Sequence, residues 1–324
     1  MSQLTLPTYE NVRLASARIA EYIYQTPVLV NAVLDDIAGA NCFFKAECLQ
    51  QTGSFKLRGA INRLLQIPED HRRAGVVAFS SGNHAQGVAR AARLLGMPAL
   101  IVMPEDAPKI KVDGVRRDAG EIRFYDRARE SREEIATAIA TERNATLVPS
   151  FDDPMIVAGQ GTCGLELYEQ VDELDAIVCC TGGGGLITGI ALTYEGLSPH
   201  TEIWTAEPEG HEDWQRSLLT GELVSNASGV RSICDAILTP QPGQLTWALG
   251  NRLLKGGLVV SDDQIRRAMQ LAFRNLKVVL EPGGAAALAA ILFAMPKHFK
   301  GKRIGVILTG GNVDAEVFSQ ILRY

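Results

Sequence analysis

The sequence has little that would suit a membrane, a nucleic acid or secretion. No apolar run reaches the roughly 18 residues of a membrane-spanning helix. The N-terminal MSQLTLPTYENVRLA lacks the basic start and apolar core of a signal peptide. Asp and Glu number 37 against 32 Lys and Arg, so the formal net charge is −5, and no basic stripe stands out. We therefore expect a cytoplasmic protein that binds neither membranes nor nucleic acids.

Cysteine is present without any recognisable pattern. The six cysteines form no CxxC pair and no ladder of spacings; they are Cys42, Cys48, Cys163, Cys179, Cys180 and Cys234. Two of them lie next to each other in an apolar, strand-like run. This distribution favours reduced, mostly buried thiols.

What the chain does have is a regular alternation of short apolar runs and helix-length amphipathic stretches. Its 324 residues, 46% hydrophobic and 21% charged, are enough for one large domain or two lobes with a proper core. Strands are predicted at 76–79, 99–103, 121–125, 145–148, 176–180, 203–206 and 304–308. Helices are predicted at 84–95, 110–119, 131–143 and 186–194, and a further one opens at Asp153-Pro154. We expect an α/β fold of two open, twisted, mostly parallel sheet domains, residues 1–71 plus 149–324 and residues 72–148.

The most informative residue is Lys56, in the run SFKLRGA. It lies between Phe55 and Leu57, just after Gly53 and Ser54, which is an unusual setting for a solvated cation. A surface lysine on an amphipathic turn is the alternative, but the apolar neighbours favour burial of at least part of its stem. Burial lowers the pKa of a lysine and makes the neutral, nucleophilic amine available.

Four consecutive glycines, Gly182–Gly185, follow one predicted strand and precede a predicted helix; we call them the glycine loop. Without side chains, the backbone can approach an anion closely with its N–H groups, and the helix N-terminus adds favourable partial charge. The run is neither a Walker loop nor a GxGxxG fingerprint. A flexible turn is the alternative; we predict a phosphate-binding loop.

Two further polar segments follow predicted strands. SSGNHAQG places Ser80, Ser81 and Asn83 at a helix start, where their donors suit a carboxylate or a ring oxygen, although an N-capping turn would look the same. His84 follows as a substrate-binding candidate, although histidines in such positions are more often structural. LTGGNVD places Thr309 at a strand end, where open α/β sheets bind ligands, with an ordinary strand-to-helix turn as the alternative.

The stretches SFKLRGA, SSGNHAQGVA and TGGGGLITGI, in this order and spacing, resemble the fold-type II pyridoxal-phosphate enzymes, which have a tryptophan synthase β-like fold. Within them the chain is similar to the serine/threonine dehydratase and serine racemase group. The resemblance runs from TPV at 26–28 to the GGNVD near the C-terminus. It implies pyridoxal 5′-phosphate as cofactor, an amino acid as substrate and a homodimer as assembly.

The resemblance also implies roles for matching residues around the cofactor. Lys56 would form the imine with pyridoxal phosphate, Phe55 would pack against its ring, and Asn83 would hydrogen-bond the ring oxygen. Thr309 would face the pyridine nitrogen. The phosphate would be bound by the glycine loop, that is by Gly182, Gly183, Gly184 and Gly185.

Substrate residues are implied in the same way. Ser80 and Ser81 would lie on the side of the substrate opposite Lys56, and Ser81 matches the second acid/base of the racemases. Arg132, in ESREE, aligns across a one-residue gap with an arginine that reaches the substrate carboxylate in the racemases; a surface arginine on a helix is the alternative. Glu281, in LEPGGA, matches a glutamate near the cofactor and would support the site.

A cation site is implied by AEPEGHED, which places Glu207, His211 and Asp213 at the spacing found in serine racemase-like members. There, two carboxylates and one main-chain carbonyl bind the ion. Hard oxygen ligands suit Mg²⁺ or Ca²⁺, and Mn²⁺ is a further possibility. Apart from the resemblance, a solvated loop is the alternative.

The chemistry implied is removal of the Cα proton of an amino acid by Lys56. Thr309 is neutral and cannot hold a proton on the pyridine nitrogen as an aspartate would, so a β-hydroxyl should be expelled quickly. The first hypothesis is therefore a dehydratase (ammonia-lyase) that converts serine, threonine, 3-hydroxyaspartate, phenylserine or a close relative to a 2-oxo acid and ammonia. The alternative is a racemase with elimination as a side reaction, in which Ser81 reprotonates Cα from the opposite face.

A third hypothesis is a non-catalytic sensor of phosphate ligands that uses the glycine loop alone. The preferred amino acid cannot be inferred from the sequence. The loop at 228–242 is the expected contributor to the side-chain pocket, and its Arg231 suits an acidic substrate or is simply a surface residue.

Overall fold

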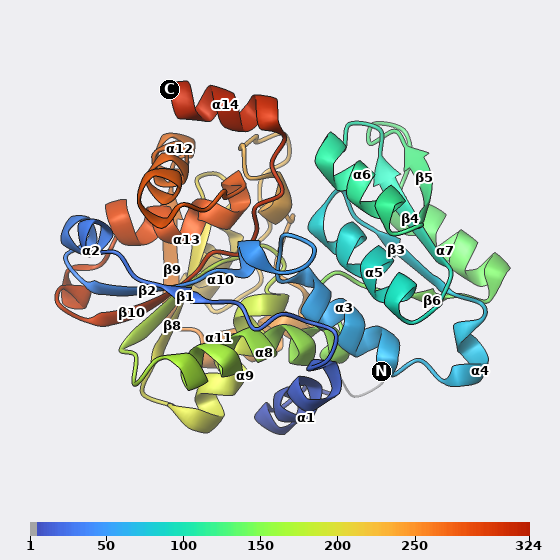
Figure 1. The fold of residues 1–324 in the computed structure, drawn as a ribbon, viewed down its shortest axis with the longest axis horizontal. Helices are drawn as coiled ribbons and strands as arrows, with labels where there is room; N and C mark the ends of the chain where they lie inside the picture. Colours follow the sequence, from blue (N-terminus) through green and yellow to red (C-terminus); the bar gives the residue numbers. More distant parts are fainter. Residues whose placement is uncertain (1–4) are drawn as a thin grey trace.

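The computed structural model describes residues 5–324 and contains two sheets that lie side by side in Figure 1. The larger sheet has the order β1-β2-β10-β7-β8-β9, with β1 (Val28–Leu29), β2 (Asn41–Lys45), β7 (Ala176–Cys180), β8 (Glu202–Pro208), β9 (Gly256–Val260) and β10 (Arg303–Ile307). Its neighbours pair in parallel except β1 with β2. The smaller sheet is parallel throughout, in the order β5-β4-β3-β6, with β3 (Val76–Phe79), β4 (Ala99–Pro104), β5 (Glu121–Tyr125) and β6 (Thr146–Leu147).

Helices cover both sheets, as the alternating pattern predicts. The α-helices are α1 (Tyr9–Ile19), α2 (Ala32–Ala38), α3 (Lys56–Leu65), α4 (Glu69–Arg72), α5 (Asn83–Leu94), α6 (Lys109–Arg117), α7 (Arg132–Arg143), α8 (Pro154–Gln170), α9 (Gly185–Leu197), α10 (Asp213–Thr220), α11 (Gln244–Leu253), α12 (Asp262–Leu271), α13 (Pro282–Phe293) and α14 (Ala315–Arg323). Short helical turns are η1 (Glu47–Leu49), η2 (Asp235–Ile237), η3 (Ala272–Leu276) and η4 (Lys297–Phe299). The predicted fold class, an α/β protein with mostly parallel sheets, is confirmed.

Several predicted elements agree with the structure to the residue. The strands at 76–79, 121–125 and 176–180 have the predicted bounds, and the side chain of Asp153 caps α8 by accepting hydrogen bonds from the backbone N–H groups of Met155 and Ile156. Every strand of the smaller sheet comes from the segment between residues 76 and 147. The domain boundaries after residues 71 and 148 remain a prediction.

Helix α3 connects the two sheets (Figure 1). Its apolar face, with Leu57 and Ile61, is buried in the same core as Val88 of α5 and Ile101 of β4. On its other side, Gly59 lies so close to the backbone of α8 that a Cβ atom there would be 2.9 Å from the carbonyl oxygen of residue 156. The N-terminal end of α3, where Lys56 lies, is therefore held from both sides.

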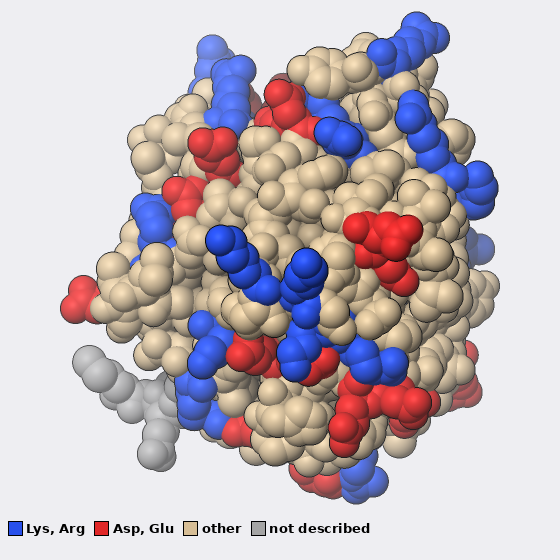
Figure 2. Space-filling model, turned by 90° about the vertical axis from the view of Figure 1, so that its left-hand side faces the viewer, with Lys and Arg blue, Asp and Glu red and all other residues tan. Residues whose placement is uncertain are grey.

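The surface and the cysteines add two observations. Among residues 5–324, no helix is long and apolar enough to cross a membrane. All six cysteines are buried and have free thiols, as predicted. Figure 2 shows the side of the molecule at the left of Figure 1, where basic and acidic side chains are interspersed with uncharged surface.

Candidate active site

Lys56 lies at the carboxyl end of β10, although 250 residues separate the two in sequence. The segment before Lys56 is hydrogen-bonded to the turn after β10: the N–H of Phe55 donates to the Thr309 carbonyl at 3.3 Å, and that of Gly311 donates to the Gly53 carbonyl at 2.9 Å. Ser54 and Gly310 form an isolated bridge. This pairing brings Lys56 and Thr309 to the side of the larger sheet at which its parallel strands end, where open α/β sheets bind ligands. We call this side the edge of the active site, or simply this edge.

The Lys56 amine has few partners for a cation. Its Nζ donates to the Ser150 carbonyl at 2.9 Å and lies 5.1 Å from the centroid of the Phe55 ring. Burial lowers the pKa of Lys56 to about 8, although the Glu281 carboxylate opposes that shift. A large fraction of the amine is therefore neutral at mildly basic pH, as a nucleophile or a base requires.

A buried ion cluster fixes α3 two residues beyond Lys56. The Arg58 guanidinium is fully buried and pairs with Glu47 at 2.8 Å and with Glu166 at 2.6 Å. Lys45 of β2 also pairs with Glu166, at 2.7 Å. A buried charge must be fully paired to be tolerated, so the cluster ties α3 to β2 and α8 in one arrangement.

The glycine loop follows β7 at the same edge, and its geometry requires glycine. Gly184 has φ = +95°, and a Cβ atom there would overlap the Trp214 ring; a Cβ at Gly183 would overlap the ring of Phe151. Among residues 5–324, no protein atom accepts a hydrogen bond from the backbone N–H of Gly182, Gly183 or Gly184. Donors in this position, ahead of the N-terminus of α9, fit an anion such as phosphate.

Asn83 begins α5 and is buried. Its Nδ2 donates to Oε1 of Glu281, and its Oδ1 accepts from Nδ2 of Asn312 at 2.8 Å. The second Nδ2 hydrogen of the Asn83 amide is free to reach a ring oxygen. Helix α5 approaches Lys56 closely, since a Cβ atom at Gly87 would be 3.0 Å from the carbonyl carbon of Lys56.

The remaining substrate candidates lie around the end of β3. Ser80 and Ser81 are half-buried, and the Ser80 hydroxyl accepts from the backbone N–H of Gly82 at 3.1 Å. Arg132, the first residue of α7, lies over the ring of Phe79, the last residue of β3, at 5.4 Å. Arg132 is thus beside the strand end that leads to Ser80, and its other contact is the neighbouring Glu133 at 2.8 Å.

His84 is buried and neutral. Burial and the nearby Lys56 charge lower its pKa to about 3, so the imidazole carries no charge at physiological pH. Its Nε2 therefore donates to the Val148 carbonyl, 3.0 Å away. This contact holds α5 against the segment that follows β6.

The predicted cation residues lie at the end of β8 and the start of α10. Both carboxylates are buried: Glu207 accepts from the backbone N–H of Trp214 at 2.8 Å, and Asp213 accepts from Nδ2 of Asn226 at 2.6 Å. Burial raises the pKa of Asp213 to about 7 and that of Glu207 well above its usual value. Oδ2 of Asp213 is buried without a hydrogen-bond partner. These features fit a bound cation.

The same residues do not form a three-side-chain metal cluster. Within the described part of the chain, no three His, Cys, Asp or Glu side chains gather as metal ligands. The His211 imidazole instead contacts the Val230 carbonyl through Nε2 at 3.2 Å. A site of two carboxylates and one main-chain carbonyl requires only two of these side chains, and it remains a prediction.

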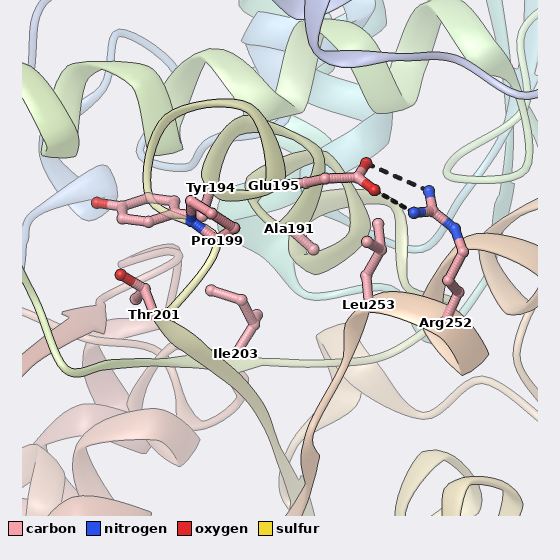
Figure 3. Close-up of a pocket in the computed structure, with 8 residues that line it drawn as sticks. All are labelled: Ala191, Tyr194, Glu195, Pro199, Thr201, Ile203, Arg252 and Leu253. Carbon is pink, nitrogen blue, oxygen red and sulfur yellow. Dashed lines mark hydrogen bonds and ion pairs between the residues drawn. The ribbon is translucent and has the colours of Figure 1, made fainter.

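Figure 3 shows a pocket in another place. It has a volume of about 270 Å³, is lined by Thr201 and Ile203 at the start of β8, and is flanked by an ion pair between Glu195 and Arg252. Strands β7 and β8 are parallel, so the pocket lies at the opposite end of the sheet from the glycine loop. Ligands of open α/β sheets bind at the carboxyl ends of the strands, so this pocket is not the candidate active site.

Comparison with known proteins identifies the family. Residues 19–310 match the family model described as pyridoxal-phosphate dependent enzyme, and the chain belongs to this family. It is 44% identical to an L-threo-3-hydroxyaspartate ammonia-lyase of a Pseudomonas species, over 99% of this chain and 100% of that protein. It is 41% identical to a serine racemase of Schizosaccharomyces pombe, over 98% of each. The solved structure of maize serine racemase superposes with a TM-score of 0.93 at 38% identity, over 98% of each chain. The predicted dehydratase and racemase group of fold-type II enzymes is thereby confirmed.

Several residues of this edge were not singled out from the sequence. They are Ser150, Trp214, Asn312 and Lys111, which contact Lys56, Gly182, Asn83 and Glu281 respectively. Asn312 lies within LTGGNVD, so its position beside Thr309 was a usable signal. Ser150 contributes only a backbone carbonyl, for which the sequence carries no signal.

Proposed function

We propose that the protein is an ammonia-lyase that converts a β-hydroxy L-amino acid to a 2-oxo acid and ammonia. The observation that carries the proposal is a lysine amine of lowered pKa at the same sheet edge as a glycine loop with free N–H donors. The printed activity of the Pseudomonas relative supports 3-hydroxyaspartate as a substrate, together with serine and threonine as smaller members of the class.

The residues present fit pyridoxal phosphate. In this proposal Lys56 binds the cofactor covalently, Phe55 packs beside its ring, Asn83 donates to the ring oxygen, Thr309 faces the pyridine nitrogen, and Gly182–Gly185 bind the phosphate. When bound, the cofactor acidifies the Cα proton of an amino acid. A neutral threonine at the pyridine nitrogen favours expulsion of a β-substituent over a long-lived carbanion.

The protein's own groups then move the protons. Lys56, with a pKa near 8, accepts the Cα proton and later returns one. The β-hydroxyl leaves as water after taking a proton, and in this proposal the Ser81 hydroxyl, just before α5, supplies that proton. The released enamine takes up one water to give the 2-oxo acid and ammonia. Arg132, beside Phe79, is proposed to bind the substrate carboxylate.

A turnover screen tests this function. We expect the purified protein to release a 2-oxo acid and an equal amount of ammonia from at least one of L-serine, L-threonine, L-threo-3-hydroxyaspartate and phenylserine. The 2-oxo acid is followed with a hydrazine reagent, and the unhydroxylated amino acids alanine and aspartate serve as controls. Absence of keto acid from all the hydroxy amino acids would refute dehydration.

Racemisation is the second candidate function, favoured by the half-buried Ser81 in the segment between the end of β3 and Asn83, the first residue of α5. If Ser81 protonates Cα on the face opposite Lys56, Ser81→Ala should abolish D-amino acid formation. Elimination from the L-substrate should continue at a rate reduced by about 10²-fold to 10⁴-fold, the typical contribution of a general acid. Chiral chromatography measures both the D-amino acid and the L-substrate that remains, and the 2-oxo acid assay follows elimination. D-product that persists unchanged in Ser81→Ala would contradict this role.

We also propose a divalent cation, Mg²⁺ in the first place and Ca²⁺ or Mn²⁺ otherwise, bound by Glu207, Asp213 and the His211 carbonyl. Mg²⁺ should raise the thermal midpoint and EDTA should lower it, because the cation offsets the burial of two carboxylates. At a concentration 100 times the dissociation constant, the gain is about 2.7 kcal/mol.

The matched variants are Glu207→Gln, which should lose the Mg²⁺ response, and Glu209→Gln, an exposed residue of the same loop that should keep it. Calorimetry with and without EDTA measures the thermal midpoint of both variants. An equal Mg²⁺ response in the two variants would place the cation elsewhere.

Three broader proposals accompany the function. We propose a homodimer, a division into residues 1–71 plus 149–324 and residues 72–148, and a cytoplasmic location. Exposed apolar side chains near β1 support the homodimer: Val30, Val33 and Tyr24 are 66%, 53% and 57% exposed. The separate smaller sheet supports the division of the chain.

A further inference from the structure

Lys111 of α6, noted above as a partner of Glu281, is a buried lysine with no role in the proposed function. It is 1% exposed, and its Nζ lies 2.6 Å from Oδ2 of Asp235 and 3.0 Å from Oε2 of Glu281. Burial by itself would lower the pKa of Lys111, yet the two carboxylates outweigh burial and raise it. Lys111 is therefore a charged, ion-paired lysine, in contrast to Lys56, whose pKa is lowered.

The three partners come from different parts of the fold. Helix α6 packs with α5 and the smaller sheet, since Val112 and Val115 lie in the same core as Ile101. Glu281 precedes α13, and Asp235 begins η2; both belong to the part of the chain that forms the larger sheet. The Lys111 ion pairs thus connect the two sheets across the edge where Lys56 lies.

A second contact anchors the same end of α6. The carboxylate of Asp314 accepts from the backbone N–H of Lys109 at 3.1 Å and of Ile110 at 2.9 Å. A carboxylate from another part of the fold thereby satisfies the free N–H groups at this helix start and favours its dipole. Two independent contacts, one buried and one exposed, hold the N-terminus of α6 against the larger sheet.

Each ion-pair partner of Lys111 lies close to a residue that is proposed to bind the cofactor. Glu281 accepts from Asn83, which in turn accepts from Asn312. Asp235 begins the turn that contains Ile237, and a Cβ atom at Gly182 would be 3.1 Å from the Ile237 Cα. Lys111 therefore lies between the start of α5 and the glycine loop, the two segments proposed to hold opposite ends of the cofactor.

We propose that Lys111 is a positioning residue: by pairing with Glu281 and Asp235 it holds the two sheets against each other and orients the Asn83 amide toward the cofactor ring. The inference rests on the pyridoxal phosphate of the proposed function, but it does not depend on which substrate the enzyme uses. A carboxylate as buried as Glu281 needs its cationic partner, so loss of Lys111 should release the contact between the sheets and let Asn83 reorient.

The experiment compares Lys111→Met with Lys109→Met in the holoenzyme. Lys109 is on the same helix but is exposed, and its side chain pairs with Asp113 in the next turn. Hydrogen exchange of the α6 amides and the absorption of the bound cofactor are measured in both variants, and kcat in addition. We expect faster α6 exchange, a shifted cofactor spectrum and a kcat about 10- to 100-fold lower in Lys111→Met. Lys109→Met should match the wild type, and Lys111→Arg, which keeps the charge, should recover part of the loss.

A chain that fails to fold does not end the test, because Asp235→Asn removes one partner at a residue whose side chain is 39% exposed. It should show the same changes to a smaller degree. Unchanged α6 exchange and an unchanged cofactor spectrum in Lys111→Met, or in Asp235→Asn should the former not fold, would overturn the proposal. Neither readout depends on turnover, so both remain interpretable even if the wild type yields no 2-oxo acid from any amino acid.

Discussion

Replacing Lys56 by alanine is expected to lower kcat for elimination by about 10⁴-fold or more, because the change removes both the covalent attachment and the base. The Lys56 amine has a pKa of about 8, and its Nζ donates a hydrogen bond to the Ser150 carbonyl. The variant should fold normally, since α3 remains tied by the buried Arg58 pairs with Glu47 and Glu166. Its solutions should lack the absorption of a lysine-bound cofactor.

Lys300→Ala is the matched control, since this lysine is exposed and lies far along the chain, just before β10. It should keep the activity and the spectrum of the wild type. Circular dichroism and thermal unfolding establish that both variants are folded. A folded Lys56→Ala protein with activity within about 10-fold of the wild type would remove the base from the proposed chemistry.

Replacing Gly184 by alanine is expected to weaken cofactor binding by about 100-fold, that is by nearly 3 kcal/mol. Two effects add. A non-glycine residue at φ = +95° is strained by on the order of 1–3 kcal/mol. In addition, the new methyl group would overlap the Trp214 ring and displace the loop whose N–H groups are proposed to bind the phosphate. Fluorescence titration of the cofactor-free protein with pyridoxal phosphate measures the dissociation constant.

Gly221→Ala separates the two effects. Gly221 also has a positive φ, +75°, but a Cβ atom there would meet nothing within 4 Å. This variant should lose a similar amount of conformational stability and bind the cofactor as the wild type does. Equal cofactor affinity in the two variants would show that the glycine loop is not the phosphate site.

Local patterns were enough to predict several elements, among them two strands of the smaller sheet and the start of one helix. Apolar runs bounded by glycine and polar residues gave the strands at 76–79 and 121–125, and Asp153-Pro154 gave the start of α8. The first two strands of the larger sheet, β1 and β2, had no such signal. β1 has only two residues, and β2 pairs with β10 at a separation of 262 positions, as between Asn41 and Arg303, so its role depends on long-range pairing.

The residues of the candidate site also differ in whether local sequence reveals them. Lys56 could be recognised because a lysine stood between two apolar residues. Lys111 stands between Ile110 and Val112 and has the same local signal, but the sequence gave no indication of the partners that keep it charged. The pKa of Lys111 is raised because Asp235 and Glu281, far away in sequence, lie within 3.0 Å of its Nζ. The pKa of Lys56 is lowered because burial outweighs the opposing effect of the Glu281 carboxylate.

The most direct test of the central claim is to reduce the holoenzyme with borohydride and locate the modified residue by peptide mapping. The reduction converts a lysine-bound cofactor into a stable amine adduct. The account predicts one pyridoxyl group per chain, on the peptide that contains SFKLRGA and at Lys56. An adduct on another lysine, or none in a protein that has retained its cofactor, would contradict it.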